Sequence, residues 1–277
     1  MSLIVVEAGQ GERGYWQDVW RFRELFFFLS WRDILVRYKQ TVIGVLWAVI
    51  RPILTTIVFT FAFRRLANMP SDGLPYPLMV FAGTLPWTFF SASLTEASNS
   101  LITNANMLSK IYFPRLVLPA SAVIVSFVDF AISLLILAAL LGWYQAWPDW
   151  KLLTLPLFTL LALGASLGAS FWLGALNVKY RDFRYVVPFI VQFGFYLTPV
   201  GYPSDTVRTK CGEWAFRLYA LNPMVGVVDG FRWAIGGRAQ VAIDWSGVGI
   251  SAAVVLLLFV SGLRYFRATE ETFADII

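Results

Sequence analysis

The chain has 277 residues, of which 58% are hydrophobic, 17% aromatic and only 14% charged, with a mean hydropathy of +0.66. An average soluble domain is about 45–50% apolar and about 25% charged, so this composition excludes a disordered chain and an ordinary water-soluble protein and indicates an integral membrane protein. The absence of His and the single cysteine, Cys211, exclude zinc sites built on His and Cys, intrachain disulfides and catalysis by Cys–His or Ser–His–Asp groups. No G-x-x-x-x-G-K-[ST] loop occurs, so the chain does not bind ATP through a P-loop, and the net charge of +5 indicates membrane topology rather than nucleic-acid binding.

The first 42 residues are predicted to lie outside the bilayer core. Residues 1–20 form a cytoplasmic N-terminus and carry no apolar stretch of the length of a secretory signal. Residues 21–42 mix apolar and basic side chains at helical spacing, which predicts an amphipathic interface helix in the cytoplasmic headgroup layer. A soluble helix packed on a neighbour is the alternative, and the run Phe26-Phe27-Phe28 favours the membrane surface.

Six apolar stretches predict membrane-spanning helices, because about 20 residues at about 1.5 Å each cross the hydrocarbon core. They are residues 43–63, 76–98, 116–141, 152–176, 185–200 and 246–266. The fourth holds Gly164 and Gly168 in a G-x-x-x-G spacing, which lets two helices approach closely. The predicted fold class is therefore an all-α integral membrane protein with one transmembrane domain at residues 43–266.

Residues 201–245 are moderately apolar but are broken at Asn222-Pro223. Proline disfavours helix at the residue before it, so two short helices fit this segment better than one span. We expect a re-entrant or periplasmic helix hairpin before the last span, because irregular backbone at membrane depth must be surrounded by protein or by a water-filled cavity.

The distribution of Arg and Lys predicts the orientation of the chain. With the N-terminus and residues 267–277 in the cytoplasm, most basic residues of the short loops are cytoplasmic, Lys110 and Arg181 among them. The two short external loops hold only Arg64, Arg65 and Lys151. This asymmetry supports a topology with both termini inside.

Two predicted cytoplasmic segments stand out, residues 99–115 and residues 177–184. The first is polar, then basic and aromatic, and ends at Pro114, which fits a short helix presented to the cytosol. Both segments could be solvated turns that obey the positive-inside rule. The alternative is that they dock a soluble partner, because aromatic side chains beside Arg are common interface anchors.

Three charged residues fall inside predicted spans. Arg51 should face protein, water or a lipid phosphate, or should extend its side chain to the cytoplasmic headgroups, because Arg at the bilayer centre costs about 2.5–3.5 kcal/mol on insertion scales. Asp129 should either pair with a cation such as Arg51 or stay protonated within the helix packing. Glu96 lies near the cytoplasmic end of its span and could simply be interfacial.

Two other function classes are disfavoured. The chain has neither a series of buried acids for proton relay nor paired broken helices in two similar halves, which disfavours ion-coupled secondary transport. Its external acids are scattered without a D-x-D pair, which disfavours a membrane enzyme that acts on a lipid phosphate.

Four stretches in order resemble one known family. They are YKQTVIGVLWAVIRP at 38–52, NANMLSKIYFPRLVLP at 104–119, NVKYRDFRYVVPFIVQFGFYLTPVGYP at 177–203 and LNPMVGVVDGFRWAI at 221–235. Together they resemble the membrane subunits of ABC-2 type polysaccharide exporters, and most closely the permeases of O-antigen (lipopolysaccharide) exporters. Exporters of capsule and teichoic acid are near relatives, and a drug exporter of the same type fits less well.

The resemblance implies a homodimer in the bacterial inner membrane that binds two copies of a separate ABC ATPase. This chain would then be a transport subunit and not an enzyme, without a cofactor of its own, and ATP and Mg would bind to the ATPase. Residues 99–115 would be the main coupling helix and residues 177–184 the second cytoplasmic contact. The expected coupling residues are Asn104, Asn106, Lys110, Tyr112, Phe113, Arg115, Lys179, Tyr180, Arg181 and Asp182.

The substrate that the resemblance implies is a polysaccharide on undecaprenyl diphosphate, moved from cytoplasm to periplasm. The diphosphate needs cations where it enters, and the candidates are Arg32, Arg37, Lys39 and Arg51. The glycan needs a wet channel lined by aromatic rings, and the candidates are Trp87, Phe89, Phe90, Phe193, Phe195 and Tyr196, for which lipid-facing packing is the alternative. The hairpin would gate the periplasmic exit through Tyr202, Trp214, Tyr219, Asn222, Pro223, Phe231 and Trp233, and the spans would pivot at Pro52, Pro86 and Pro188.

Overall fold

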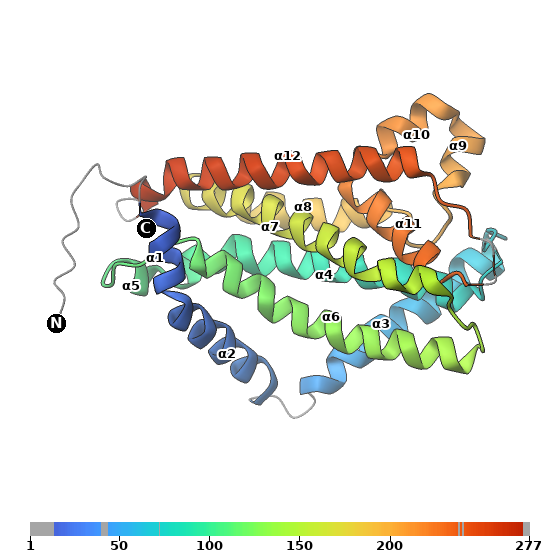
Figure 1. Cartoon of the computed structure of the whole chain (residues 1–277), viewed down its shortest axis with the longest axis horizontal. Helices are drawn as coiled ribbons and strands as arrows, with labels where there is room; N and C mark the ends of the chain where they lie inside the picture. Colours follow the sequence, from blue (N-terminus) through green and yellow to red (C-terminus); the bar gives the residue numbers. More distant parts are fainter. Residues whose placement is uncertain (1–13, 40–43, 72, 238, 240, 274–277) are drawn as a thin grey trace.

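The structure is a computed structural model that describes residues 14–39, 44–71, 73–237, 239 and 241–273. Most of the predicted N-terminal segment, the junction after the interface helix and the last four residues lie outside the described residues. In the described part every regular element is helical, which agrees with the predicted all-α class. Figure 1 shows α4, α6, α7 and α12 running roughly along the long axis of the molecule, with α2 and α3 oblique to them.

The N-terminal half contains four long helices and three short ones. The short helix α1 (Tyr15–Arg21) leads into α2 (Arg23–Lys39), which corresponds to the predicted interface helix. Then follow α3 (Gly44–Phe59), continued by a π-helical segment η1 (Thr60–Leu66), and α4 (Tyr76–Thr103). The short helix α5 (Ala105–Leu108) separates α4 from α6 (Val117–Trp143).

The C-terminal half begins with a 3-10 segment η2 (Trp150–Thr154) that leads into α7 (Leu155–Lys179). After α8 (Phe183–Tyr196) come three shorter helices, α9 (Asp205–Cys211), α10 (Glu213–Tyr219) and α11 (Pro223–Ile235). The chain continues with α12 (Trp245–Thr269) and a 3-10 segment η3 (Glu270–Thr272).

Five helices of the described chain are long and apolar enough to cross a membrane. They correspond to five of the six predicted spans: Leu46–Leu66, Tyr76–Thr103, Val117–Trp143, Trp150–Lys179 and Trp245–Thr272. The remaining predicted span, 185–200, corresponds to α8, whose 14 residues rise only about 21 Å. The sixth crossing therefore stays a prediction.

Helix α4 lies at the centre of the bundle, and α3 lies at its edge. The most apolar stretch of α4 is 78% buried inside the chain, against 11% for the α3 span. α4 packs mainly against α6 and α7, and α7 packs against α12. Apolar side chains of α3 therefore face outward, toward lipid or another protein.

The predicted G-x-x-x-G contact joins α7 to α12. A Cβ at Gly168 would lie 2.6 Å from the backbone nitrogen of Phe259, and a Cβ at Gly262 would lie 2.4 Å from the carbonyl oxygen of Gly168. Such a distance is shorter than real Cβ atoms show, so both positions need glycine for the backbones to approach this closely.

The described ends of the chain meet at one end of the bundle, called here the termini end. The hydroxyl of Tyr15 donates a 3.0 Å hydrogen bond to Glu270, and the guanidinium of Arg267 lies over the ring of Tyr15. The opposite end, called here the distal end, carries α9 and α10 (Figure 1). This placement agrees with the prediction that both termini lie on one side.

The segment 201–245 contains three helices rather than the two predicted. Helix α11 begins at Pro223, and the side chain of Asn222 accepts a 3.0 Å hydrogen bond from the backbone nitrogen of Met224. The break at Asn222-Pro223 is therefore where the sequence placed it, with Asn as N-cap and Pro in the first turn. A second break at Gly212, whose φ is +88°, separates α9 from α10.

Candidate functional site

The first coupling segment lies at the termini end. It differs from the expected single helix over 99–115, because residues 99–103 continue α4 and only Ala105–Leu108 forms a further helix. The buried side chains of Leu108 and Phe113 anchor the segment in a core cluster with Phe171, Phe266 and Phe273. These two buried side chains flank an exposed loop, residues 109–112.

This loop presents an apolar and basic surface. Ile111 and Tyr112 are 58% and 59% exposed, and Lys110 beside them is exposed as well. An open hollow of about 240 Å³ lies against this loop. Phe113, in contrast, is only 3% exposed, so its ring supports the loop from inside and is closed to a partner. Sequence reasoning included Phe113 and missed Ile111, although both lie in the same apolar run.

The second segment is fastened next to the first. The side-chain amide of Asn177, near the end of α7, donates hydrogen bonds to the carbonyl of Ser98 (2.9 Å) and to the side chain of Asn99 (3.1 Å) near the end of α4. Beyond this junction four predicted coupling residues are exposed: Lys179, Tyr180, Arg181 and Asp182. The structure thus brings both predicted segments to the same end of the bundle.

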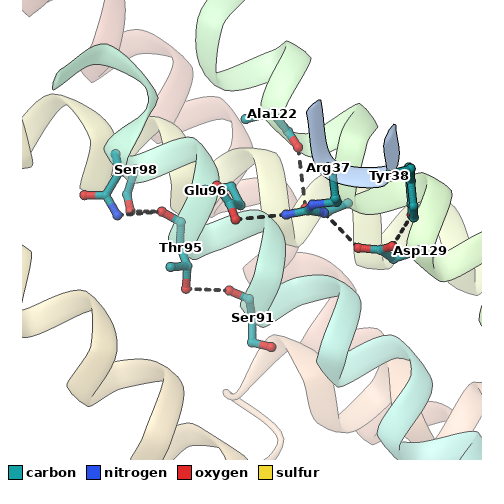
Figure 2. A network of polar contacts seen from close by, with 10 residues as sticks. Arg37, Tyr38, Ser91, Thr95, Glu96, Ser98, Ala122 and Asp129 are labelled. Atoms are coloured by element: carbon teal, nitrogen blue, oxygen red, sulfur yellow. Dashed lines mark hydrogen bonds and ion pairs between the residues drawn. The ribbon is translucent and has the colours of Figure 1, made fainter. Parts of the chain in front are cut away.

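Of the four cations expected at the diphosphate, Arg37 is already engaged. Its guanidinium lies 2.8 Å from Asp129 on α6 and 2.9 Å from Glu96 on α4, and the hydroxyl of Tyr38 donates to the same Asp129. Figure 2 shows Arg37 pointing between the two carboxylates. Burial and the hydrogen bond to Asp129 raise the pKa of the Tyr38 phenol, so it stays a neutral donor.

This cluster corrects two expectations. The cation that pairs with Asp129 is Arg37 and not Arg51, because α2 packs along α6 and brings Arg37 to it. Glu96 is not merely interfacial, since it shares the same guanidinium. The cluster contains one cation and two carboxylates, so its net charge is negative. This net charge disfavours the binding of an anionic ligand at Arg37.

The other three cations differ in their surroundings. Arg32 forms a 2.8 Å ion pair with Asp33 and donates to Asn104 at 3.3 Å, which links α2 to the first coupling segment at the junction of α4 and α5. Lys39 is exposed at the end of α2, and Arg51 is exposed on α3 with its guanidinium over the ring of Trp47. Among the described residues, neither of these two cations forms an ion pair.

The six channel candidates separate into two groups. Trp87, Phe89 and Phe90 are only 4%, 2% and 7% exposed and belong to the core around α4, so within this chain they line neither a wet groove nor the lipid. Phe195 is half-buried and packs edge-on against Phe59.

The remaining two candidates belong to an exposed aromatic row on α8. Phe193 is 49% and Tyr196 66% exposed. Tyr185 and Phe189, which sequence reasoning missed, extend the row at spacings of three and four residues, so all four lie on one face of the helix. That helical spacing is the signal that could have identified them.

The gate candidates also divide between surface and core. On the surface, Trp214 is 69% exposed. Tyr202 and Tyr219 are half-buried, and their hydroxyls lie 3.1 Å apart. In the core, Phe231 is fully buried and Trp233 is 8% exposed on α11. Helix α11 packs between α4, α7 and α12, so it forms part of the bundle.

Two arginines that the sequence did not indicate organise the distal end. Arg232 on α11 is 2% exposed and donates to the carbonyls of Val200 and Tyr202 at 2.8 Å and to that of Met79 at 3.3 Å. Arg208 on α9 pairs with Asp244 and lies 2.9 Å from Glu213. The three carbonyls that bind Arg232 and the carboxylate of Asp244 that binds Arg208 are distant in sequence, so no local pattern indicates these contacts.

Comparison with known proteins agrees with this architecture. The family model described as "ABC-2 type transporter" matches residues 24–235, which is most of the chain. Three curated relatives carry the name "O-antigen export system permease protein RfbA". One from Myxococcus xanthus is 29% identical over 94% of this chain and 98% of its own length. Two from Klebsiella pneumoniae are 27% and 26% identical over 92% of this chain and 95% of theirs.

Proposed function

Since the chain belongs to the ABC-2 type transporters, a family of membrane transport subunits, we propose that it moves polysaccharide of the O-antigen type, linked to undecaprenyl diphosphate, from cytoplasm to periplasm. The observation that carries this proposal is the match over nearly the full length of three relatives named as O-antigen export permeases. The five apolar helices agree with a multi-pass permease.

The family implies an ATPase partner, and we propose that two copies bind a homodimer of this chain at the termini end. The docking surface would combine Ile111 and Tyr112 of the first segment with Tyr180 of the second. Exposed aromatic and apolar side chains beside Lys and Arg suit an interface of this kind. Asn104 and Arg115 would support the loop from behind, as their half-buried positions suggest.

For the diphosphate we propose Arg51 and Lys39 as the cations at the entrance. Both are exposed, and among the described residues neither is neutralised by a carboxylate. Arg37 is unsuited to this role because Glu96 and Asp129 share it. The head group would then pass between α2 and α3, near the start of the first span.

For the glycan we propose a path between two copies of the chain, bordered by the exposed face of α8. Phe193 and Tyr196 offer ring faces to sugar C–H groups, and the ring of Phe189 is tilted beside that of Phe193, with the two ring centroids 4.2 Å apart. The outward face of α3 would border the same path, since so little of α3 is buried within one chain.

We further propose a sixth crossing formed by α8 together with residues 197–203. A Cβ at Gly194 would meet the ring of Trp87 near the middle of α4, and the hydroxyl of Tyr76 at the start of α4 donates to the carbonyl of Gly201, so the two pieces together follow α4 from its middle to its distal end. This topology places Cys211, the only cysteine, in the periplasm. A membrane-impermeant maleimide should label Cys211 from outside in intact spheroplasts, and labelling only after lysis would contradict the topology.

The function is tested by isolating the chain in detergent with its native partners, followed by mass spectrometry of proteins and lipids. We expect an ATPase subunit in equal amount and undecaprenyl-linked glycan whose sugars identify the substrate. Deletion of the gene should remove O-antigen from the cell surface. Loss of capsule or teichoic acid alone would identify that polymer as the substrate in place of O-antigen. Repeated isolation without any ATPase would contradict the proposal that the chain is part of an ATP-driven exporter.

A further inference from the structure

A cavity of about 350 Å³ lies at the distal end, between the pair α9–α10 and the buried helix α11. Asp205 and Arg208 line it from α9, Asp229 and Arg232 line it from α11, and residues 241–244 form a further wall. Its size falls within the range of about 300–1,000 Å³ that small-molecule sites occupy.

One side of the cavity is formed by ion pairs around Arg208. Arg208 pairs with Asp244, lies 2.9 Å from Glu213 and 3.7 Å from Asp205, and stacks over Phe216 at 4.1 Å. Of these ion pairs, the one between Arg208 and Asp244 joins α9 to the residue that precedes α12, and those with Asp205 and Glu213 lie within the pair α9–α10. On this side of the cavity the ion pairs hold charged side chains in place.

The other side is rigid. Arg232 donates to three carbonyls, two of them in the irregular segment after α8. Other side chains hold the same segment, since Tyr76 donates to Gly201 and Asn222 donates to Leu197 at 3.0 Å. A cavity bordered by fixed groups keeps its shape, which lowers the cost of binding a ligand.

The remaining wall offers backbone groups. Residues 241–243 belong to no helix or strand, so no regular ladder of hydrogen bonds consumes their peptide N–H and C=O groups. Peptide groups beside carboxylates and guanidinium groups supply both donors and acceptors.

These groups favour a neutral ligand with many hydroxyls. An anion would meet three carboxylates, and both arginines are already engaged. Among the residues that the structure describes, no group of three or more His, Cys, Asp or Glu side chains is placed to hold a metal ion. An apolar ligand would cover the peptide groups of residues 241–243 and offer them no hydrogen bond in return, which is unfavourable.

We propose that this cavity binds a sugar unit of the glycan as it leaves the membrane path. The inference rests on the proposed function, because that function places a polysaccharide at this end of the protein. The site would retain the emerging end and oppose its return.

The test uses the full chain in detergent and, as probe, the O-polysaccharide of the source bacterium released by mild acid and trimmed to fragments of a few sugars. Calorimetry gives the affinity, and an environment-sensitive fluorophore on Cys211, which is exposed at the end of α9, reports binding at this place. The variant Ala242→Trp puts a large ring on an exposed residue of the cavity wall. The control Ala67→Trp puts the same ring on an exposed residue of the distal end outside the cavity.

We expect the fragments to bind the wild type and the control alike and to bind Ala242→Trp about tenfold more weakly, with loss of the fluorescence change. No binding to the wild type, or equal binding to Ala242→Trp, would overturn the inference. Export by the complete complex in vesicles is measured separately. If the complex exports glycan but Ala242→Trp binds the fragments as the wild type does, the proposed function stands and the cavity proposal fails. If the wild-type complex moves no glycan, the proposed function fails, and the binding measurements alone test whether the cavity binds sugar.

Discussion

The guanidinium of Arg37 on α2 lies 2.8 Å from the carboxylate of Asp129 on α6, a residue 92 positions later in the chain. The same guanidinium reaches Glu96 on α4, so one side chain joins the interface helix to the two central helices of the bundle. A second link joins α2 to the first coupling segment through Arg32 and Asn104, at the junction of α4 and α5. Displacement of this junction would therefore be transmitted to α2 directly.

The Arg37 cluster should contribute measurable stability. We expect Asp129→Asn and Arg37→Met each to lower the melting temperature in detergent, and a double-mutant cycle should give a coupling of about 1 kcal/mol, modest because both side chains are roughly one-third exposed. Arg21→Met, on an exposed position of α1, is the control and should leave the melting temperature unchanged. Purely additive effects of the two substitutions would show that the ion pair contributes nothing to the free energy of unfolding.

Substitution of Tyr112 should affect docking of the ATPase, whereas substitution of Phe113 should affect the stability of the fold. Tyr112→Ala should weaken binding of the ATPase with little change in melting temperature, because its ring is exposed. Phe113→Ala should destabilise the chain by about 3–5 kcal/mol, because it leaves a cavity in the core cluster. Pull-down of the ATPase and thermal unfolding check the two effects, and equal loss of stability in both variants would contradict the placement of these rings.

The close contact between α7 and α12 should not accept a methyl group at Gly168. Gly168→Ala should lower the melting temperature by an amount equivalent to about 1–3 kcal/mol, because the backbones must separate. The control Gly249→Ala adds the same group where a Cβ would meet nothing within 4 Å, and there stability should stay equal or rise. An unaffected Gly168→Ala variant would mean that the helices pack farther apart.

Asp244 should make stability depend on acid pH. Burial alone would raise the pKa of Asp244, but hydrogen bonds from Ser246 and the ion pair with Arg208 outweigh burial and hold that pKa below its ordinary value. A lowered pKa in the folded state means that the stabilisation is present above the ordinary value of about 3.9 and is lost as the pH falls through the folded value. Asp244→Asn should melt earlier than the wild type at pH 7, and this difference should shrink below about pH 4. A constant difference across this range would contradict the assignment.

Arg232 should be more sensitive than any exposed arginine. Arg232→Met leaves the carbonyls of Val200 and Tyr202, which lie outside any helix, without this donor, at about 1–3 kcal/mol for each unsatisfied group. We expect loss of the folded protein on size-exclusion chromatography, with partial recovery in Arg232→Lys, which keeps the charge but reaches fewer carbonyls. Arg217→Met on the exposed face of α10 is the control and should behave like the wild type.

The sequence predicted the elements that depend on local chemistry. Five long apolar helices follow from runs of about 20 apolar residues, and the start of α11 follows from Asn222-Pro223. The contact at Gly168 follows from the spacing of small residues. Each of these features is determined by neighbours along the chain, so no knowledge of the tertiary arrangement is needed.

The environment of individual side chains could not be predicted in the same way. In a membrane protein both the core and the lipid-facing surface are apolar, so hydropathy does not distinguish the buried Trp87 from the exposed Tyr196. The partner of Asp129 depends on how α2 lies across α6, and the role of Arg232 depends on a connector 30 residues earlier. These relationships arise only when distant helices pack.

The hydrogen bond between Tyr15 and Glu270 joins residues that are 255 positions apart. During synthesis at about 5–20 residues per second, α1 must wait roughly 13 to 50 s before its partner is made. Helix α1 is thus first in the sequence and among the last elements to reach its final contacts. Its contacts with Arg267 on α12 and with Glu270 on η3 can form only after these residues have been made.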